Sequence, residues 1–335
     1  MRNNFFRKKT ILITGGTGSF GKALLKKLID SNLGLKKIII FSRDELKQFE
    51  LQKLYNLEKY PFLRFFLGDI RDPNRLKYAF KEVDYVIHAA ALKQVPAAEY
   101  NPFEFIQTNV LGVQNIIESS LINNVKKVIA LSTDKAVSPL NLYGATKLCG
   151  EKLFISANNY SGSRKISFSV VRYGNVFGSR GSVFHEFRRQ NENKLFEITD
   201  KNMTRFNIEM KDAVEMVIWA LINSVGNEIF IPKIPSIKII DLAKAIDDKC
   251  KISFKGIRAG EKLHEELISS SESFNTFDIK KYYVILNNTR VRNYYFKNFK
   301  ARKINSNFSY NSETNKYFLD INEIKRIINK YKTSD

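Results

Sequence analysis

The chain has 335 residues, 44% of them hydrophobic, and its 55 Lys and Arg against 34 Asp and Glu give a formal net charge of +21. That length suits two lobes that share a cleft. No apolar run reaches the ~18–20 residues of a membrane span, and the run after the basic N-terminus is shorter than the ~7–15 residues of a signal-peptide core, so we expect a cytoplasmic protein without a membrane partner.

Short apolar runs alternate with helix-period patterns through the first half of the chain. We expect strands at residues 10–14, 37–41, 63–67, 84–88, 128–131 and 168–172, and helices at residues 20–30, 45–57, 103–120 and 142–157. Such alternation predicts an α/β fold of the Rossmann type, a doubly wound parallel sheet with helices on both faces. After Arg172 the pattern loosens, although a helix is clear at residues 212–224. We therefore expect a dinucleotide-binding domain at residues 1–172 and, at residues 173–335, a smaller lobe that mainly binds substrate and partly returns to the first domain.

A glycine-rich turn joins the first expected strand to the first expected helix. Gly16-x-Gly18-x-x-Gly21 matches the dinucleotide fingerprint in the strand-to-helix context that the fingerprint requires. Residues without a Cβ let the backbone turn sharply and approach a pyrophosphate, and the helix N-terminus offers unpaired N–H groups. We predict that this turn binds a dinucleotide through Gly15, Thr17, Gly18, Ser19 and Phe20.

The end of the second strand should select the cofactor. An acidic residue there accepts a hydrogen bond from the ribose 2′-hydroxyl group, whereas a basic residue accommodates a 2′-phosphate. Ser42 and Arg43 come first, and Lys47 follows one turn later. Asp44 fits the N-cap of the next helix. Because a guanidinium group donates two hydrogen bonds to one phosphate, the sequence favours NADP over NAD.

Two further strand ends extend the expected cofactor site. Asp69, after the third strand, is placed to accept from the adenine amino group, whereas Asp72 before Pro73 is better explained as a helix cap. Small side chains after His88 would let the cofactor lie against the backbone. The other cofactor-binding residues that we expect are Ile70, Ala89, Ala90, Ala91, Lys93, Tyr143 and Lys147, with Lys147 on a ribose hydroxyl group.

Tyr143 and Lys147 are four residues apart in an expected helix, so both side chains lie on one helix face. The tyrosine is a candidate acid and base for oxidation of a carbon, and lowering its pKa from ~10 to neutrality takes ~3 units, or ~4 kcal/mol. An ammonium group ~4 Å away at an effective dielectric constant of ~20 supplies about that much. We therefore expect Lys147 to lower the pKa of Tyr143, and Thr133 to donate a hydrogen bond to the reacting oxygen.

Asp134 and Lys135 directly follow an expected buried strand, at the edge where α/β sheets bind ligands. The alternative is a solvated turn. A 4-keto sugar has an acidic hydrogen on carbon 5, which a neutral amine can remove while a protonated carboxyl group gives a proton to the departing 6-hydroxyl group. This use requires the pKa of Lys135 to fall below its usual ~10.4. With Tyr143, the pair predicts an enzyme that oxidises a carbon and eliminates water.

We expect neither a metal nor a nucleic acid as a ligand. Cys149 and Cys250 lack metal-ligand spacing and are expected to be buried free thiols, and the three histidines are scattered. Residues 280–303 carry eight basic residues, no acidic residue and interleaved tyrosines and phenylalanines. Such a tract can bind nucleic acid, but a solvated surface is the simpler explanation. The positive charge favours an anionic small substrate such as a nucleotide diphosphate.

Several motifs resemble those of one family. They include TGGTGSFGK at residues 14–22, GDIRD at 68–72, HAAALKQVPAAEYNP at 88–102, ALSTDKA at 130–136, NLYGATKL at 141–148 and IRAGEKLHE at 257–265. With them the chain resembles the extended short-chain dehydrogenase/reductases and, among these, the inverting UDP-N-acetylglucosamine 4,6-dehydratases, which begin pseudaminic acid synthesis for flagellin glycosylation. Ordinary sugar-nucleotide dehydratases tend to carry Asp-Glu where this chain has Asp134-Lys135.

The resemblance implies a redox-neutral cycle. Hydride leaves carbon 4 for NADP+ while Tyr143 takes the hydroxyl proton. Lys135 removes the carbon 5 proton, Asp134 assists the loss of water from carbon 6, and hydride returns to carbon 6. Reprotonation of carbon 5 on the other face, by Lys135 or a group that it relays through, gives UDP-2-acetamido-2,6-dideoxy-β-L-arabino-hex-4-ulose.

The resemblance also implies a homo-oligomer and a set of UDP-sugar contacts. These contacts are Lys93, Lys135, Tyr173, Asn175, Val183, Thr204, Arg205, Arg258 and Glu261, with the two arginines on the diphosphate and Glu261 on ribose hydroxyl groups. Gln94, Ala259 and Asn207 depart from the family pattern. Two alternatives stay open: a UDP-sugar 4-epimerase, which would have no use for Asp134 and Lys135, and a retaining or related UDP-N-acetylhexosamine dehydratase for surface polysaccharide.

Overall fold

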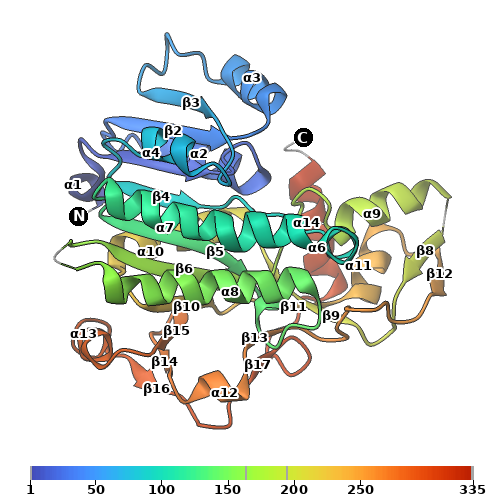
Figure 1. Cartoon of the computed structure of the whole chain (residues 1–335). Coiled ribbons are helices and arrows are strands. Elements are labelled where there is room, and N and C mark those ends of the chain that lie inside the picture. Colours follow the sequence, from blue (N-terminus) through green and yellow to red (C-terminus); the bar gives the residue numbers. More distant parts are fainter. Residues whose placement is uncertain (1, 163, 194, 333–335) are drawn as a thin grey trace.

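The computed structural model describes residues 2–162, 164–193 and 195–332, and within them the centre of the molecule is a ten-stranded sheet (Figure 1). Its strand order is β16-β14-β15-β10-β6-β5-β4-β1-β2-β3. The strands from β10 to β3 are parallel, and β15, β14 and β16 continue the sheet antiparallel at one edge. The bounds are β1 Thr10–Thr14, β2 Lys37–Ser42, β3 Leu63–Leu67, β4 Tyr85–His88, β5 Lys127–Thr133, β6 Ser167–Tyr173, β10 Glu228–Pro232, β14 Thr276–Asp278, β15 Tyr282–Leu286 and β16 Arg302–Lys303.

The inner parallel strands are continuous buried runs, as a sheet covered on both faces requires. Every residue of β1 and of β6 is buried. The predicted doubly wound α/β fold is confirmed, and the strands expected at 10–14 and 63–67 have those bounds. β5 runs two residues beyond its expected end, to Thr133. Asp134 is therefore the first residue beyond the carboxyl edge of this central strand.

Helices cover both faces of the sheet (Figure 1). On one face α7 (Gly112–Ile122) packs on α8 (Leu142–Ala157), and α8 packs on β5 and β6. On the other face α2 (Ser19–Asp30) packs on α10 (Met210–Asn223), which contacts the same two strands. The other helices are α1 Arg2–Phe6, α3 Glu45–Leu54, α4 Pro73–Ala79, α5 Val95–Tyr100, α6 Pro102–Ile106, α9 Val183–Gln190, α11 Ile239–Ile246, α12 Ser270–Ser273, α13 Thr289–Phe299 and α14 Ile321–Lys332, and short 3₁₀ turns lie at η2 Asp134–Ala136, η3 Asn158–Tyr160 and η4 Asn191–Asn193.

The single helix expected at residues 103–120 is interrupted. Between α6 and α7 lies a π-helical turn, η1 (Gln107–Leu111). Within it, Asn109 accepts from the Leu92 N–H and donates to the Leu92 carbonyl, both at 2.9 Å, and its Nδ2 lies 3.1 Å from Thr146 Oγ1. Through Asn109, the π-helical turn thus connects the chain after β4 to helix α8. The apolar periodicity of the sequence does not indicate this tertiary contact.

The chain after Arg172 partly returns to the main sheet, since it supplies β10, β14, β15, β16 and α10. Its remaining strands form a smaller lobe with the orders β11-β9-β7, β12-β8 and β13-β17. Their bounds are β7 Asn175–Val176, β8 Leu195–Ile198, β9 Thr204–Ile208, β11 Ser236–Lys238, β12 Lys251–Phe254, β13 Glu266–Ile268 and β17 Tyr310–Asn311. Phe187, Phe196, Leu242 and Ile328 belong to a second buried cluster in this lobe.

The basic tract at residues 280–303 forms β15, α13 and β16. Its Tyr282 and Tyr295 are buried in the main core, so two of its aromatic side chains serve packing. The prediction of two buried thiols is wrong: Cys149 is exposed on the outward side of α8, and Cys250 is partly exposed. No helix in the three described ranges is long and apolar enough to cross a membrane.

Candidate active site

The glycine-rich turn packs against the end of β4. Gly15 has a φ of +66°, and a Cβ there would lie 2.8 Å from the Ala90 backbone nitrogen. Gly21 meets Gly16 equally closely, since a Cβ on Gly21 would lie 2.5 Å from the Gly16 Cα. Two of the predicted cofactor segments, the turn and the small residues after His88, are therefore in direct backbone contact. A side chain on Gly15 would fill the cradle that a pyrophosphate needs.

Helix α2 begins over this turn. Its N-cap is Gly18, which has no side chain to accept from the first N–H groups, and the Gly18 N–H itself donates to the Gly15 carbonyl at 2.9 Å. The first-turn N–H groups of α2, beginning at Ser19 and Phe20, are thus left for an anion. Thr17 Oγ1 lies 2.8 Å from Ser42 Oγ, which joins the turn to the end of β2. These residues fit a dinucleotide.

The residues predicted to select the cofactor are mostly paired with one another. Asp44 caps α3, as predicted, and its carboxylate also pairs with Lys47. The Arg43 side chain is 53% exposed, and its guanidinium lies 3.8 Å from Asp69 Oδ2. Burial opposes ionisation of Asp69, but hydrogen bonds from Arg71 outweigh burial and hold the pKa of Asp69 below its usual value. Arg43 is therefore the cation of this group that is most open to a ligand.

The predicted acid and base lie inward, beside each other. Asp134 is fully buried, and its Oδ1 lies 3.1 Å from Lys135 Nζ. Thr133 Oγ1 donates to the same carboxylate oxygen at 2.9 Å. Asp134 Oδ2 is buried without a hydrogen-bond partner among the described residues. The alternative of a solvated turn is therefore excluded for this pair.

A second carboxylate, Glu265, completes this cluster, and the sequence did not single it out. Glu265 Oε1 lies 3.1 Å from Lys135 Nζ, as close as Asp134 Oδ1 does. Burial favours the neutral amine, but the two carboxylates outweigh burial and raise the pKa of Lys135 above its usual value. The expected depression of this pKa is thus wrong in the structure. The signal for Glu265 was present in IRAGEKLHE, whose last residue precedes the buried pair Leu267 and Ile268.

Tyr143 joins the cluster from helix α8. The side chain of Asn141 caps this helix by accepting from the Gly144 N–H at 2.8 Å, and Tyr143 is 8% exposed. Burial raises the pKa of Tyr143 to about 12, although the Lys135 charge and a hydrogen bond with Thr133 act in the opposite direction. Three of the predicted catalytic residues thus surround a fourth, the phenol.

The predicted role of Lys147 differs from its observed environment. Lys147 Nζ donates to the Leu131 carbonyl at 2.7 Å, and burial lowers the pKa of Lys147 to about 8. The cation that acts on Tyr143 in the structure is Lys135. The reason is geometric, because Lys147 lies one helical turn further on and reaches the strand below it instead of the phenol.

Thr204 and Arg205, two predicted substrate contacts, are buried in β9. The Arg205 guanidinium donates to the carbonyls of Thr204, Leu263 and Lys262 at 2.7, 3.0 and 2.9 Å. Thr204 Oγ1 lies 2.7 Å from Ser312 Oγ. The polar atoms of these two residues therefore hold the segment that carries Glu265. For Arg205 we had expected a contact with the diphosphate instead.

The other predicted substrate contacts lie around the cluster. Tyr173, at the end of β6, is buried and interacts electrostatically with Tyr143, and Asn175 and Val183 begin β7 and α9. Lys93 Nζ donates to the Arg180 carbonyl at 2.9 Å, and the Arg180 N–H donates to Ser19 Oγ at 3.3 Å. This chain of contacts links the cofactor turn to the smaller lobe.

Arg258 and Glu261 differ from the buried contacts because they are open to solvent. The Arg258 side chain is 72% exposed, and its Nε lies 3.5 Å from Glu261 Oε2. The expected contact of Arg258 with a diphosphate stays a prediction. Glu261 also accepts from Thr199 Oγ1 at 3.3 Å.

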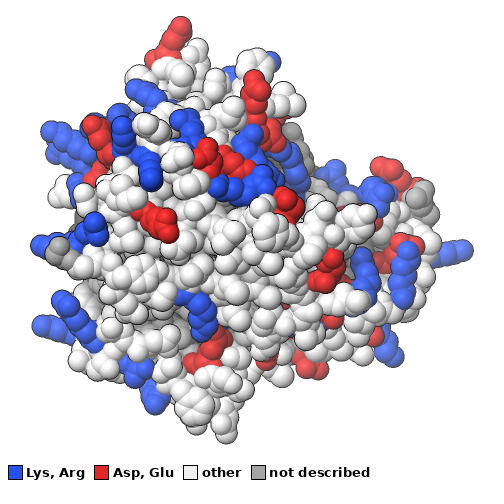
Figure 2. Space-filling view, viewed as in Figure 1, with Lys and Arg blue, Asp and Glu red and all other residues white. Residues whose placement is uncertain are grey.

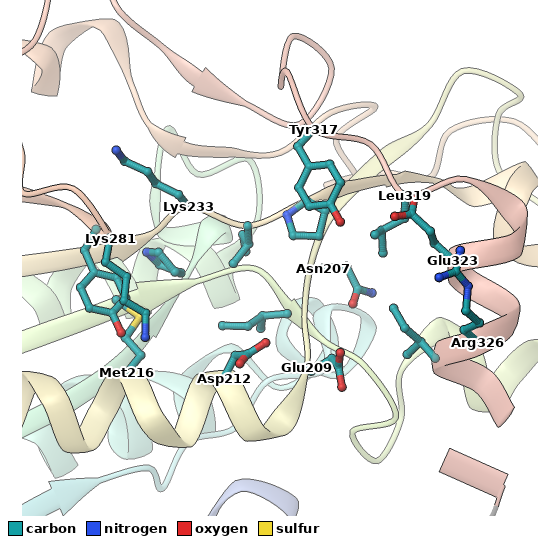
Figure 3. Close-up of a pocket in the computed structure, with 16 residues that line it drawn as sticks. Asn207, Glu209, Asp212, Met216, Lys233, Lys281, Tyr317, Leu319, Glu323 and Arg326 are labelled. Atoms are coloured by element: carbon teal, nitrogen blue, oxygen red, sulfur yellow. The ribbon is translucent and has the colours of Figure 1, made fainter. Parts of the chain in front are cut away.

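A cavity of about 500 Å³ lies elsewhere, between α10, α14 and the chain around residues 232–235. Figure 3 shows Glu209, Asp212 and Arg326 around it, with the Asn207 side chain at its centre. None of the predicted site residues lines this cavity. The departure from the family pattern at Asn207 therefore lines this cavity.

Comparisons with known proteins agree with this geometry. The family model described as polysaccharide biosynthesis protein matches residues 11–287. The inverting UDP-N-acetylglucosamine 4,6-dehydratase of Campylobacter jejuni subsp. jejuni serotype O:2 is 50% identical over 97% of this chain and 98% of its own length. The UDP-glucose 4-epimerase of Rickettsia bellii (strain OSU 85-389) is 45% identical over 86% of each chain.

A solved structure extends the likeness to the whole molecule. The X-ray structure of Pen from Bacillus thuringiensis has a TM-score of 0.88 and 37% identity, and the match covers 98% of this chain and 99% of that one. Both lobes of the present structure are thus represented in a related protein. The chain therefore belongs to the polysaccharide biosynthesis protein family and, within it, to the family of the inverting UDP-N-acetylglucosamine 4,6-dehydratases.

Proposed function

We propose that this protein is an inverting UDP-N-acetylglucosamine 4,6-dehydratase that performs the first step of pseudaminic acid biosynthesis. The observation that carries the proposal is the position of Lys135, whose Nζ lies 3.1 Å from each of two buried carboxylates and acts electrostatically on the Tyr143 phenol. A site that only oxidises and reduces its substrate needs no acid or base besides the phenol. A dehydratase also needs an acid and a base next to it.

The chemistry that a bound dinucleotide supplies is removal of hydride from carbon 4 and its return at carbon 6. Tyr143 takes the proton of the 4-hydroxyl group. Thr133 forms a hydrogen bond with Tyr143 and orients the phenol. We also assign Lys147 to a ribose hydroxyl group of the cofactor. The residues that would hold the dinucleotide are those of the Gly15 cradle, the Ser42–Arg43 corner and the segment from Ala89 to Ala91.

Asp134 and Lys135 can change roles by one proton transfer. Moving a proton across the 3.1 Å between Lys135 Nζ and Asp134 Oδ1 produces a neutral amine and a neutral acid together. The net charge of the buried cluster stays the same, so no uncompensated charge is created in a poorly solvated site. Lys135 can then take the carbon 5 proton. Asp134, with Oδ2 unpartnered among the described residues, can protonate the departing 6-hydroxyl group.

Reprotonation of carbon 5 on the opposite face, by Lys135 or a group that it relays through, would give UDP-2-acetamido-2,6-dideoxy-β-L-arabino-hex-4-ulose. The test is incubation of the purified protein with UDP-N-acetylglucosamine and identification of the product by NMR. A 4-keto-6-deoxy sugar supports the proposal. Recovery of only the 4-epimer would reject it in favour of a UDP-sugar 4-epimerase.

The 4-epimerase is the second candidate, because a Rickettsia bellii protein of that name is 45% identical to this chain. An epimerase needs a redox phenol but no base for carbon 5. The two buried carboxylates that pair with Lys135 favour the dehydratase, since burying them would serve no step of epimerisation. A retaining dehydratase would be told apart by the configuration of carbon 5 in its product.

We propose NADP as the cofactor because Arg43 is the exposed cation at the end of β2 and Asp44 is committed to its helix cap and to Lys47. We also propose that residues 1–172 bind the cofactor and that residues 173–335 mainly bind the substrate, since the expected cofactor contacts precede residue 173 and most of the expected substrate contacts follow residue 172. A cytoplasmic location fits an enzyme that draws on NADP and UDP-sugars.

A homo-oligomer is a further part of the proposal. Tyr100, Phe103, Leu111 and Leu140 are exposed at 86, 60, 49 and 63%. Figure 2 shows few charged side chains over the face where α7 and α8 lie. An apolar surface of this kind favours contact with another subunit. Light scattering after gel filtration tests it, and a monomer at micromolar concentration would reject it.

A further inference from the structure

Glu265 is fixed in place by its backbone as well as by its side chain. Its N–H donates to Ser312 Oγ at 2.9 Å, and its carbonyl accepts from the Ser312 N–H at 2.8 Å. Arg205 holds the preceding carbonyls of Lys262 and Leu263. The carboxylate therefore reaches Lys135 from a rigid segment 130 residues away in the chain.

The two oxygens of Glu265 differ in their surroundings. Oε1 lies 3.1 Å from Lys135 Nζ and 3.8 Å from Arg205 Nε, whereas Oε2 is buried without a hydrogen-bond partner among the described residues. An unpaired buried carboxylate oxygen costs free energy. A salt bridge that served stability alone would be expected to satisfy both oxygens.

Glu265 is one of several ionisable groups that face Lys135. The others are Asp134 of the same turn, Tyr143 of α8, Arg205 of β9 and Lys93 after β4. Glu266 and Lys262 approach the same turn but bond to Ser138 and to the Val137 carbonyl. The two carboxylates nearest to Nζ are therefore Asp134 and Glu265, each at 3.1 Å.

We propose that Glu265 is a positioning residue for Lys135: it holds the ammonium group within reach of Asp134 and keeps the amine protonated until Asp134 takes the proton. The inference rests on the proposed function, in which Lys135 is the base. Asp134 must alternate between carboxylate and acid, so it cannot hold Nζ throughout the cycle. Glu265 does not take part in proton transfer and remains a carboxylate throughout the cycle.

The test measures the ionisation of Lys135 directly. A pulse of acetic anhydride at pH 9.5 acetylates neutral amines only, and peptide mass spectrometry reports the rate at Lys135, whose side chain is 22% exposed. Removing an opposite charge at this range lowers an amine pKa by about 1 to 3 units. Glu265→Gln should therefore speed acetylation of Lys135 about tenfold or more. It should also shift the rising limb of the pH profile of kcat/KM to lower pH.

Glu266→Gln is the matched control, because it removes the neighbouring carboxylate, which bonds to Ser138 and Ser309 and not to Lys135. Its acetylation rate should equal that of the unmodified protein. Glu265→Asp keeps the charge but withdraws it by one methylene group, so it should speed acetylation of Lys135 by less than Glu265→Gln does. If Glu265→Gln does not fold, Glu265→Asp is the variant that tests the inference.

The outcomes separate this inference from the proposed function. If the protein dehydrates its substrate and folded Glu265→Gln is acetylated at Lys135 at an unchanged rate, only the role of Glu265 is overturned. A faster rate in a protein that makes no 4-keto-6-deoxy sugar would leave the contact with Lys135 intact and overturn the proposed function.

Discussion

Gly144 lies directly against Lys135: a Cβ on Gly144 would collide with the Lys135 carbonyl oxygen. This contact lets the first turn of α8 rest on the turn after β5. The phenol of Tyr143 is thereby brought to the amine of Lys135 from a different element.

Gly144→Ala should therefore separate these two groups. The added methyl group forces the backbone of η2 and α8 apart, which should cost about 1–3 kcal/mol of stability by overpacking and about 100-fold in kcat by displacing the phenol. Thermal unfolding and steady-state kinetics measure the two effects. Cys149→Ala, on the exposed side of the same helix, should change neither. Full activity in Gly144→Ala would show that the close approach is not needed.

Lys135→Arg should remove the base while keeping the charge. A guanidinium group stays protonated in proteins, so both carboxylates keep a cation and the fold should remain stable. Dehydration should fall about 10²- to 10⁴-fold, the usual contribution of a general base, with dinucleotide affinity unchanged. The assay follows formation of the 4-keto product. Retention of full dehydration in a folded variant would show that Lys135 is not the base.

Arg43→Ala should weaken NADP but not NAD. A hydrogen-bonded ion pair with the 2′-phosphate is worth about 1.5–3 kcal/mol, so the Kd for NADP should rise about 10- to 100-fold. NAD, which lacks this phosphate, is the internal control. Titration calorimetry gives both constants, and equal losses for the two cofactors would mean that Arg43 does not select between them.

His88 should make the fold acid-sensitive. Burial lowers the pKa of His88 to about 3, and its Nδ1 lies 2.8 Å from Thr14 Oγ1. Between pH 6.5 and pH 3 the unfolded chain binds a proton at this site that the folded protein does not. The contribution of His88 to the free energy of unfolding is therefore fully present above pH 6.5. Below that pH it falls by up to about 1.4 kcal/mol for each pH unit. Urea unfolding at several pH values should show a flatter dependence for His88→Gln, and parallel curves would contradict this assignment.

Local signals in the sequence predicted much of the fold and part of the site. Buried runs and the glycine turn were enough for β1 and α2. The position of Asp134 and Lys135 followed from the end of one strand, because the carboxyl edge of a parallel sheet is where ligands bind.

What the sequence could not predict depends on contacts between distant segments. Glu265 reaches Lys135 only because Arg205 and Ser312 fold its segment over the sheet. The same contacts decide that Arg205 binds carbonyl groups and that the pKa of Lys135 rises. Lys147 was assigned to Tyr143 from spacing alone, but spacing does not record that the Leu131 carbonyl is within its reach.

The configuration of carbon 5 in the product is the most direct test of the central claim, that Lys135 and Asp134 eliminate water while carbon 5 is inverted. UDP-N-acetylglucosamine is incubated with the protein in heavy water, and the product is analysed by NMR. The account predicts a 4-keto-6-deoxy sugar with deuterium at carbon 5 and the inverted configuration there. A product that keeps its original carbon 5 hydrogen, or that retains all its hydroxyl groups, would contradict it.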